Sequence, residues 1–105
     1  REFEGAVGPD RLKIALAAYN IGLGHVLDAR ELARQQGLDA ERWDSLAQTL
    51  PLLADPRYHR QARHGYCRGS EPVRYVERVF FYYDILKRHH LDRASCDPLN
   101  LSALG

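Results

Sequence analysis

The chain has 105 residues, a formal net charge of +1 and 45% hydrophobic residues. This length suits one domain with a modest core, and 28% charged with 10% aromatic residues excludes a disordered low-complexity chain. No apolar run approaches the roughly 18 residues that a membrane span needs, and the nearly neutral charge argues against a nucleic-acid-binding protein.

The beginning of the chain carries no targeting signal that we recognise. Arg1 to Glu4 is charged and lacks the apolar stretch of a signal peptide. The sequence contains no Met. We therefore expect Arg1 to mark a cut made by processing or cloning, and the chain to be a piece of a longer protein.

The pattern is helical nearly throughout, without the alternation typical of strands, and it predicts an all-α fold of about five helices. We expect the first helix from Pro9 or Asp10 to Tyr19. Its apolar residues at helical spacing include Leu12 and Leu16, and the other faces are apolar too. A helix that is apolar on most sides is expected to be buried on most sides, at the centre of its domain.

Glycines and prolines divide the rest of the chain. Gly22 and Gly24 are expected to break the first helix, and Gly37 to end the second, which begins near His25. The second helix should direct Val26, Ala29, Leu32 and Ala33 inward. A third helix, capped by Asp39 and ended or kinked by Pro51, should bury Trp43, Leu46, Ala47 and Leu50.

The second half of the chain predicts two further helices. Asp55-Pro56 is typical of a helix start, and we expect this short fourth helix to stop at Gly65. Pro72 opens the last helix, which should end near His90. Its inward face is expected to hold Val73, Val76, Phe80 and Tyr83, with Val79 and Leu86 beside them. We predict one helical domain over residues 1–90 and a flexible tail over 91–105.

Asn20 stands where the first helix meets a glycine-rich turn. An amide in such a fixed place can bind a ligand amide or a sugar. Asparagine also caps helix ends often, and spacing alone favours that structural role by roughly two to one.

The segment Arg57–His64, together with Arg68, is rich in Arg and His and contains no acid. Such a patch can bind carboxylates or phosphates, but composition alone favours a solvated helix face. The five histidines are His25, His59, His64, His89 and His90. Their spacing matches no metal-binding motif, so we expect neither a metal nor a cofactor.

No residue stands out as a catalyst. Glu71 suits the first turn of a helix, and Glu77 is expected to form a surface pair with Arg74. Cys67 and Cys96 lie 29 positions apart, without a CxxC motif, and we expect two free thiols.

Two stretches nevertheless resemble a known family. Ala15–Gly22 (ALAAYNIG) resembles the Ala-Tyr-Asn motif of the lytic murein transglycosylases, lysozyme-like enzymes that cleave peptidoglycan. Gly65–Glu77 (GYCRGSEPVRYVE) and Tyr82–Leu86 (YYDIL) resemble the C-terminal end of a membrane-bound branch of that family. So do Arg42–Leu46 (RWDSL) and Leu50–Leu53 (LPLL). The resemblance covers roughly residues 8–86.

The resemblance implies an all-α, lysozyme-like fold and a single catalytic Glu. In the family this Glu protonates the glycosidic oxygen between N-acetylmuramic acid and N-acetylglucosamine, and a 1,6-anhydro product forms. It lies in a Glu-Ser motif followed by a Gly-Leu-Met-Gln motif, and this sequence contains neither. Glu2 and Glu4 lie in a stretch that only connects elements in the family, so neither is assigned the role. We expect the C-terminal half of a catalytic domain, inactive alone and exposing apolar surface.

The resemblance also assigns binding residues and partners. Tyr19, Asn20 and Tyr75 match substrate-binding positions, no catalytic residue is assigned, and the Arg57–His64 segment becomes a candidate surface for anionic peptidoglycan. Cys67 replaces an Ala of the family motif. The implied partners are peptidoglycan glycan strands and the missing N-terminal half of the domain, in a periplasmic protein associated with the outer membrane. The alternative is a non-catalytic module that binds glycan or protein.

Overall fold

The structure, a computed structural model, describes the backbone of residues 8–96 and the side chains as far as His89. Every regular element in this part of the chain is helical, which confirms the predicted all-α fold. In chain order the elements are α1 (Gly8–Ile21), α2 (Leu23–Gln35), α3 (Trp43–Thr49), the 3₁₀ helix η1 (Leu50–Ala54), α4 (Pro56–His59) and α5 (Ser70–Cys96).

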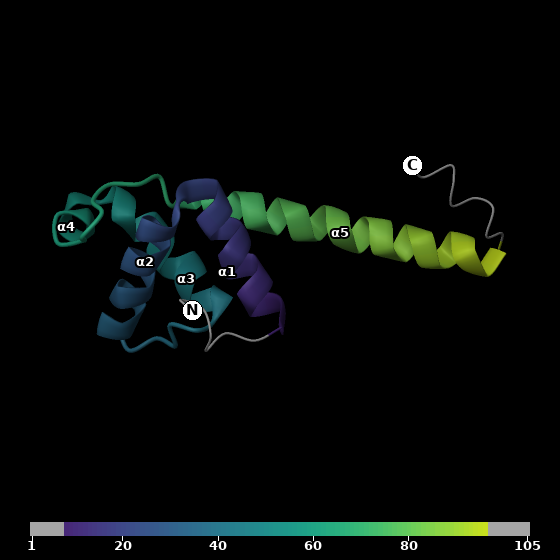
Figure 1. Ribbon diagram of the computed structural model, residues 1–105, viewed down its shortest axis with the longest axis horizontal. Coiled ribbons are helices and arrows are strands. Elements are labelled where there is room, and N and C mark those ends of the chain that lie inside the picture. Colours follow the sequence, from purple (N-terminus) through teal and green to yellow (C-terminus); the bar gives the residue numbers. More distant parts are fainter. Residues whose placement is uncertain (1–7, 97–105) are drawn as a thin grey trace.

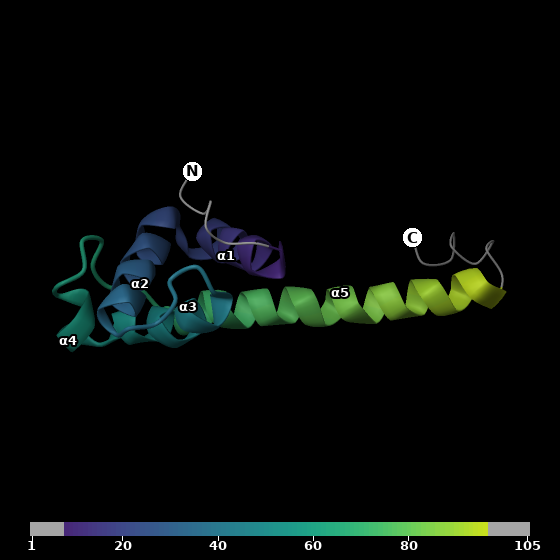
Figure 2. The same cartoon turned by 90° about the horizontal axis from the view of Figure 1, so that it is seen from below.

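The first helices gather around the beginning of α5, and the rest of α5 projects away from them as a single rod (Figures 1 and 2). Helix α1 packs along α5, and α2 packs on both α1 and α3. The core is one continuous apolar cluster that these contacts enclose. Its buried members are Ile14, Ala17, Val26, Ala29, Trp43, Leu46, Leu50, Leu53, Cys67 and Val76.

Helix α1 is less buried than its composition predicts. Only Ile14 and Ala17 are buried, whereas Leu12 is 54% exposed and Tyr19 84% exposed. The expectation that this helix is enclosed on most sides is therefore wrong for the structure. The physical reason is that neighbouring helices pack on one side of α1 and leave its other apolar side in solvent.

The break between α1 and α2 lies at Gly22 alone. This residue has φ of 103°, a conformation that favours glycine, and Gly24 lies inside α2. The end of α2 follows the prediction. Gly37, with φ of 76°, donates to Arg34 O, and Leu38 donates to Ala33 O, the two bonds of a Schellman motif.

The cap of α3 comes from a distant residue. Asp39 accepts a hydrogen bond from Glu41 N in the preceding turn, so it does not cap α3 as predicted. The N-cap position belongs to Arg42, whose side chain makes no capping bond. Instead Asp10 of α1 accepts a hydrogen bond from Trp43 N at 3.1 Å and pairs with the Arg42 guanidinium. This carboxylate therefore fastens α1 to the start of α3.

Pro51 ends α3, as predicted, and the chain continues as η1. The buried hydroxyl of Thr49 lies 3.0 Å from Ala29 O and 3.2 Å from Ser45 O, and donates its one proton there. Asp55 caps α4 by accepting from Arg57 N, again as predicted. Helix α4 ends at His59, six residues before the expected stop at Gly65, because turns occupy residues 60–64.

Gly69 fixes the point where α5 leaves the core. A Cβ atom at this position would overlap the carbonyl group of Leu50, so only glycine lets the two backbones meet. Two residues before Gly69, the backbone N–H of Cys67 donates a hydrogen bond to Leu53 O. This bond ties the same loop to η1. Pro72 then lies fully buried in the first turn of α5.

Helix α5 is buried only near its beginning. Val76 is fully buried, and Val73 and Phe80 pack against the core. Tyr83 and Leu86, expected on the inward face, are 55% and 59% exposed, because the other helices gather around the beginning of α5 and cover little of the helix beyond it (Figure 1).

The helix also continues to Cys96, beyond the predicted end near His90. Residues 91–96 contain no helix breaker, and the first one is Pro98. Of the predicted flexible tail, residues 97–105 lie outside the described part of the chain.

Cys67 belongs to the core rather than to a reactive site. Its side chain is free and only 4% exposed. Burial, with a smaller contribution from the charge of Asp28, raises the pKa of this thiol to about 11. The predicted free thiol is confirmed for Cys67, and the side chain of Cys96 lies outside the described residues.

Gly69→Ala is predicted to lower the free energy of unfolding by about 3 kcal/mol, because the methyl group forces η1 and α5 apart. The control is Gly37→Ala, where no atom lies within 4 Å of the added carbon. That variant should cost only about 1–2 kcal/mol of backbone strain. Urea unfolding compares the two, and an equal cost would contradict the close contact at Gly69.

The raised pKa of Cys67 predicts a pH dependence of stability. The unfolded thiol loses its proton near pH 9 and the folded one near pH 11. The protonated thiol of Cys67 therefore contributes to the free energy of unfolding below pH 9, and this contribution disappears as the pH rises to 11. Between pH 9 and pH 11, urea unfolding should show a smaller loss of unfolding free energy for Cys67→Ala than for the parent chain. An identical loss would show that Cys67 titrates normally.

Candidate functional site

Tyr19 and Asn20 form an exposed polar edge at the C-terminal end of α1. Both side chains are exposed, and Tyr19 is 84% exposed. The Asn20 side chain makes no hydrogen bond with any residue that the structure describes, whereas the backbone closes the helix through Gly22 N donating to Ala18 O. The structural role of Asn20 as a side-chain cap is therefore absent. Its amide is available to a ligand.

Tyr75 is placed differently from the other two predicted binding residues. It is half-buried in the second turn of α5 and packs against the apolar core. Helices α1 and α5 contact each other, so the three residues belong to adjoining elements. Two grooves are described below. None of Tyr19, Asn20 and Tyr75 lines either of them.

An apolar groove of about 440 Å³ runs between α1 and α5. Leu12 and Leu16 form one wall, and Val79, Phe80 and Tyr83 form the other. Lys13 of α1 lies over the Phe80 ring at 5.1 Å and holds the two helices together at this point. The groove offers apolar contact and almost no polar recognition.

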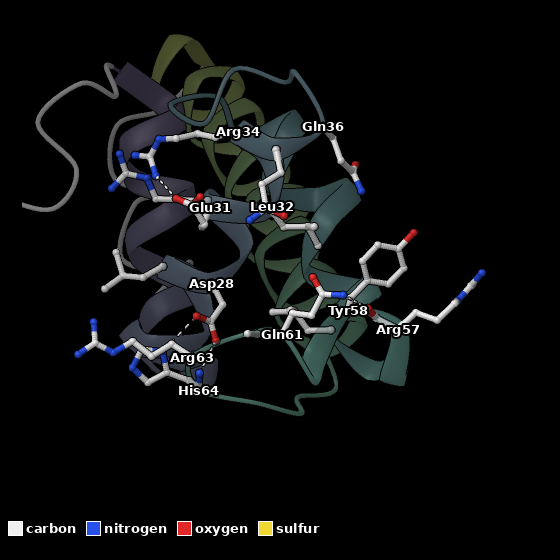
Figure 3. A pocket seen from close by; sticks show the side chains of 15 residues that line it. Asp28, Glu31, Leu32, Arg34, Gln36, Arg57, Tyr58, Gln61, Arg63 and His64 are labelled. Carbon is white, nitrogen blue, oxygen red and sulfur yellow. Dashed lines mark hydrogen bonds and ion pairs between the residues drawn. The ribbon is translucent and has the colours of Figure 1, made fainter.

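A polar groove of about 640 Å³ lies between α2 and the Arg57–His64 segment (Figure 3). The lining contains four arginines and His64 but only two acids, Asp28 and Glu31. The four are Arg30, Arg34, Arg57 and Arg63. The segment that composition assigned to a solvated face therefore forms one wall of a groove with an excess of positive charge.

Most charges around this polar groove are already paired. Arg30 contacts Glu41 at 2.8 Å, and Arg34 contacts Glu31 at 3.3 Å. Arg57 is paired with Asp55. Its side-chain hydrogen bond to this carboxylate, and to a smaller extent its backbone hydrogen bond, lower the pKa of Asp55. These pairs leave Arg63 as a cation that makes no ion pair within the described part of the chain.

The polar groove contains a pair that the sequence did not predict. The buried carboxylate of Asp28 accepts a hydrogen bond from His64 N at 2.8 Å, and its other oxygen lies 3.2 Å from His64 Nδ1. A carboxylate only accepts, so Nδ1 carries the proton. The sequence did offer one signal for this pair. Asp28 lies next to the predicted inward face of the second helix, which is an unusual position for a charged residue.

The remaining acids do not form a catalytic pair. Glu71 lies 3.6 Å from Arg68 in an exposed ion pair, and Glu77 is exposed on α5. In the described part of the chain, no three His, Cys, Asp or Glu side chains lie together as a metal site requires. None of the described helices combines the length and hydropathy needed to cross a bilayer.

Comparison with known proteins finds similar sequences. The chain is 51% identical over 88 residues to a membrane-bound lytic murein transglycosylase F of Maricaulis maris. It is 54% identical over 78 residues to the proteins of the same name from Desulfosudis oleivorans and Hahella chejuensis. No protein-family model matches the chain.

The similarity covers most of this chain and a small part of the relatives. The three alignments span 84%, 74% and 74% of the chain, but only 19%, 17% and 15% of the relatives' own length. The comparison therefore concerns one segment of those proteins.

Proposed function

Because the chain is homologous to one segment of the membrane-bound lytic murein transglycosylases F, we propose that it forms part of the catalytic domain of a peptidoglycan-cleaving enzyme. The reaction is cleavage between N-acetylmuramic acid and N-acetylglucosamine, which leaves a 1,6-anhydromuramic acid end. Residues 1–90 correspond to the C-terminal part of that domain. The observation that carries the proposal is about 50% identity over three quarters or more of the chain.

The role of this segment is to bind the glycan. Asn20 presents an amide that no described residue contacts by a hydrogen bond, at the end of a packed helix, and Tyr19 beside it presents an exposed aromatic ring. An aromatic ring and an amide are suited to a sugar face and an acetamido group, respectively. Tyr75, half-buried on α5 and packed against the core, is the third proposed substrate-binding residue.

The catalytic acid comes from another part of the protein. The sequence has no Glu-Ser pair, and Glu71 and Glu77 are exposed on the molecule rather than held in the apolar surroundings that suit a general acid. The missing N-terminal half of the domain is the partner that brings the acid. The apolar groove between α1 and α5, with Leu12 54% exposed, offers a surface for it to cover.

The cell envelope is the location that fits this function. The relatives are named membrane-bound, and peptidoglycan lies outside the inner membrane. We place the whole protein in the periplasm, in association with the outer membrane. Contact with glycan strands requires no nucleic acid and no cofactor.

A second candidate function is a non-catalytic, lysozyme-like module that holds glycan or a protein partner. The Glu-Ser and Gly-Leu-Met-Gln motifs, sought in the whole protein within roughly one domain length upstream of Arg1, separate this function from the first. The two functions differ in what the whole protein contains. An acidic residue placed opposite Asn20 in the whole protein supports the enzyme, and its absence supports the module.

The chain by itself is predicted to release no 1,6-anhydro fragments from purified peptidoglycan. A glycosidic oxygen needs a positioned acid, and removal of a general acid costs about 10²–10⁴ in rate. Mass spectrometry of the soluble products tests this, with a complete relative as the positive control. Anhydro products made by the chain alone would contradict the assignment of the acid to another segment.

In the whole protein, Asn20→Ala is predicted to lower turnover about 10- to 1,000-fold, the range for loss of one preorganised hydrogen-bond donor. Stability should change by less than about 0.5 kcal/mol, because the Asn20 side chain has no partner in the described structure. Turnover and thermal unfolding are measured on the same variant. Normal turnover would remove Asn20 from the binding site, and a large loss of stability would restore its role as a cap.

A further inference from the structure

We infer that the polar groove between α2 and the Arg57–His64 segment binds a carboxylate of an acidic peptide, with Arg63 as the residue that contacts it. The inference rests on the proposed function and deepens it, because the glycan strands of peptidoglycan carry short acidic peptides. The groove is separate from Tyr19, Asn20 and Tyr75, none of which lines it.

Arg63 is the cation of this groove that remains available. The other arginines of the lining are held by acids, Arg30 by Glu41, Arg34 by Glu31 and Arg57 by Asp55. Arg63 is exposed and makes no ion pair or hydrogen bond within the described part of the chain. A guanidinium group carries paired donors in a fork that matches a carboxylate.

The backbone beside Arg63 is fixed from α2. Asp28, whose side chain is 7% exposed, accepts the N–H of the Arg63–His64 peptide bond at 2.8 Å. Its second oxygen holds the His64 ring, so both groups of His64 are anchored to one buried carboxylate. Asp28 is therefore a positioning residue, and Arg63 starts from a rigid backbone at the edge of the groove (Figure 3).

Gly24 completes this arrangement. A Cβ atom at Gly24 would lie 2.6 Å from Cδ2 and 2.9 Å from Nε2 of His64, closer than side chains tolerate. The absence of a side chain thus makes room for the His64 ring on α2. Two separate features of α2 therefore fix residues 63 and 64 at the edge of the groove. Gly24 leaves space for the His64 ring, and the buried Asp28 holds the His64 backbone and ring.

The rest of the groove suits a peptide. Tyr58 is half-buried and Gln61 is exposed, and both line the groove with groups that donate and accept hydrogen bonds (Figure 3). Leu32 and Leu53 supply apolar contact. A volume of about 640 Å³ accommodates a few amino-acid residues.

Calorimetric titration of the full chain tests the assignment with three ligands. These are a peptide-bearing disaccharide from peptidoglycan, the same disaccharide without peptide, and the free peptide. Arg63→Gln should weaken binding of both peptide-containing ligands about 10-fold or more and leave the peptide-free disaccharide unchanged. The matched control is Arg60→Gln, the same charge change on an exposed residue of the same segment that does not line the groove.

Gly24→Ala provides a second variant that removes no charge. It should displace the His64 ring and weaken peptide binding while circular dichroism shows the helices intact. Equal effects of Arg63→Gln and Arg60→Gln, or a free peptide that the parent chain does not bind, would overturn the inference. So would inorganic phosphate that competes as well as the peptide. Failure of the parent chain to bind the peptide-free disaccharide counts against the proposed function alone, because the free peptide still reports on the groove.

Discussion

The contact between the backbones of Gly69 and Leu50 is the constraint on which the rest of the structure depends. It joins the junction between α3 and η1 to the start of α5 with no side chain between them. The hydrogen bond from Cys67 N to Leu53 O holds the same loop, and Pro72 buries the first turn of the helix. The direction of α5 follows from this junction, and the packing of α1 along α5 follows from that direction.

The same junction explains why the molecule is apolar on part of its surface. Beyond its buried first turns α5 leaves large apolar side chains in solvent, and Phe81, Tyr82, Ile85 and Leu86 are 45–61% exposed. Helix α1 also presents Leu12 to solvent. Exposed apolar area on this scale is uncommon in a domain that is complete by itself, and it agrees with a segment that covers less than a fifth of its relatives.

Helix α2 connects the two polar features of the molecule. It begins at Leu23, directly after the Gly22 turn that follows Tyr19 and Asn20. Within its first two turns it provides the Gly24 gap and the Asp28 carboxylate that hold His64. The glycan-binding edge proposed at one end of this helix and the carboxylate-binding groove inferred along its side would together suit a polymer that carries both sugars and acidic peptides.

The sequence alone determined the helical fold and most helix limits, because glycine, proline and capping residues act within a few positions. Gly22, Gly37, Pro51 and the Asp55-Pro56 pair all end or begin an element as expected. It also predicted the similarity to the lytic murein transglycosylases that the comparison found, through motifs that lie on contiguous segments. For the candidate site it supplied Tyr19, Asn20 and Tyr75, but not the side chains that surround them.

Only the tertiary structure decided which distant residues meet. Asp10 caps α3 across 33 positions, and Asp28 holds His64 across 36. The sequence pattern also could not predict the exposure of α1 and of the far part of α5. An apolar face shows that a helix can be buried, but it does not show which other element is present to cover that face. Local signals choose the conformation of a segment, whereas packing of the segments chooses its partners.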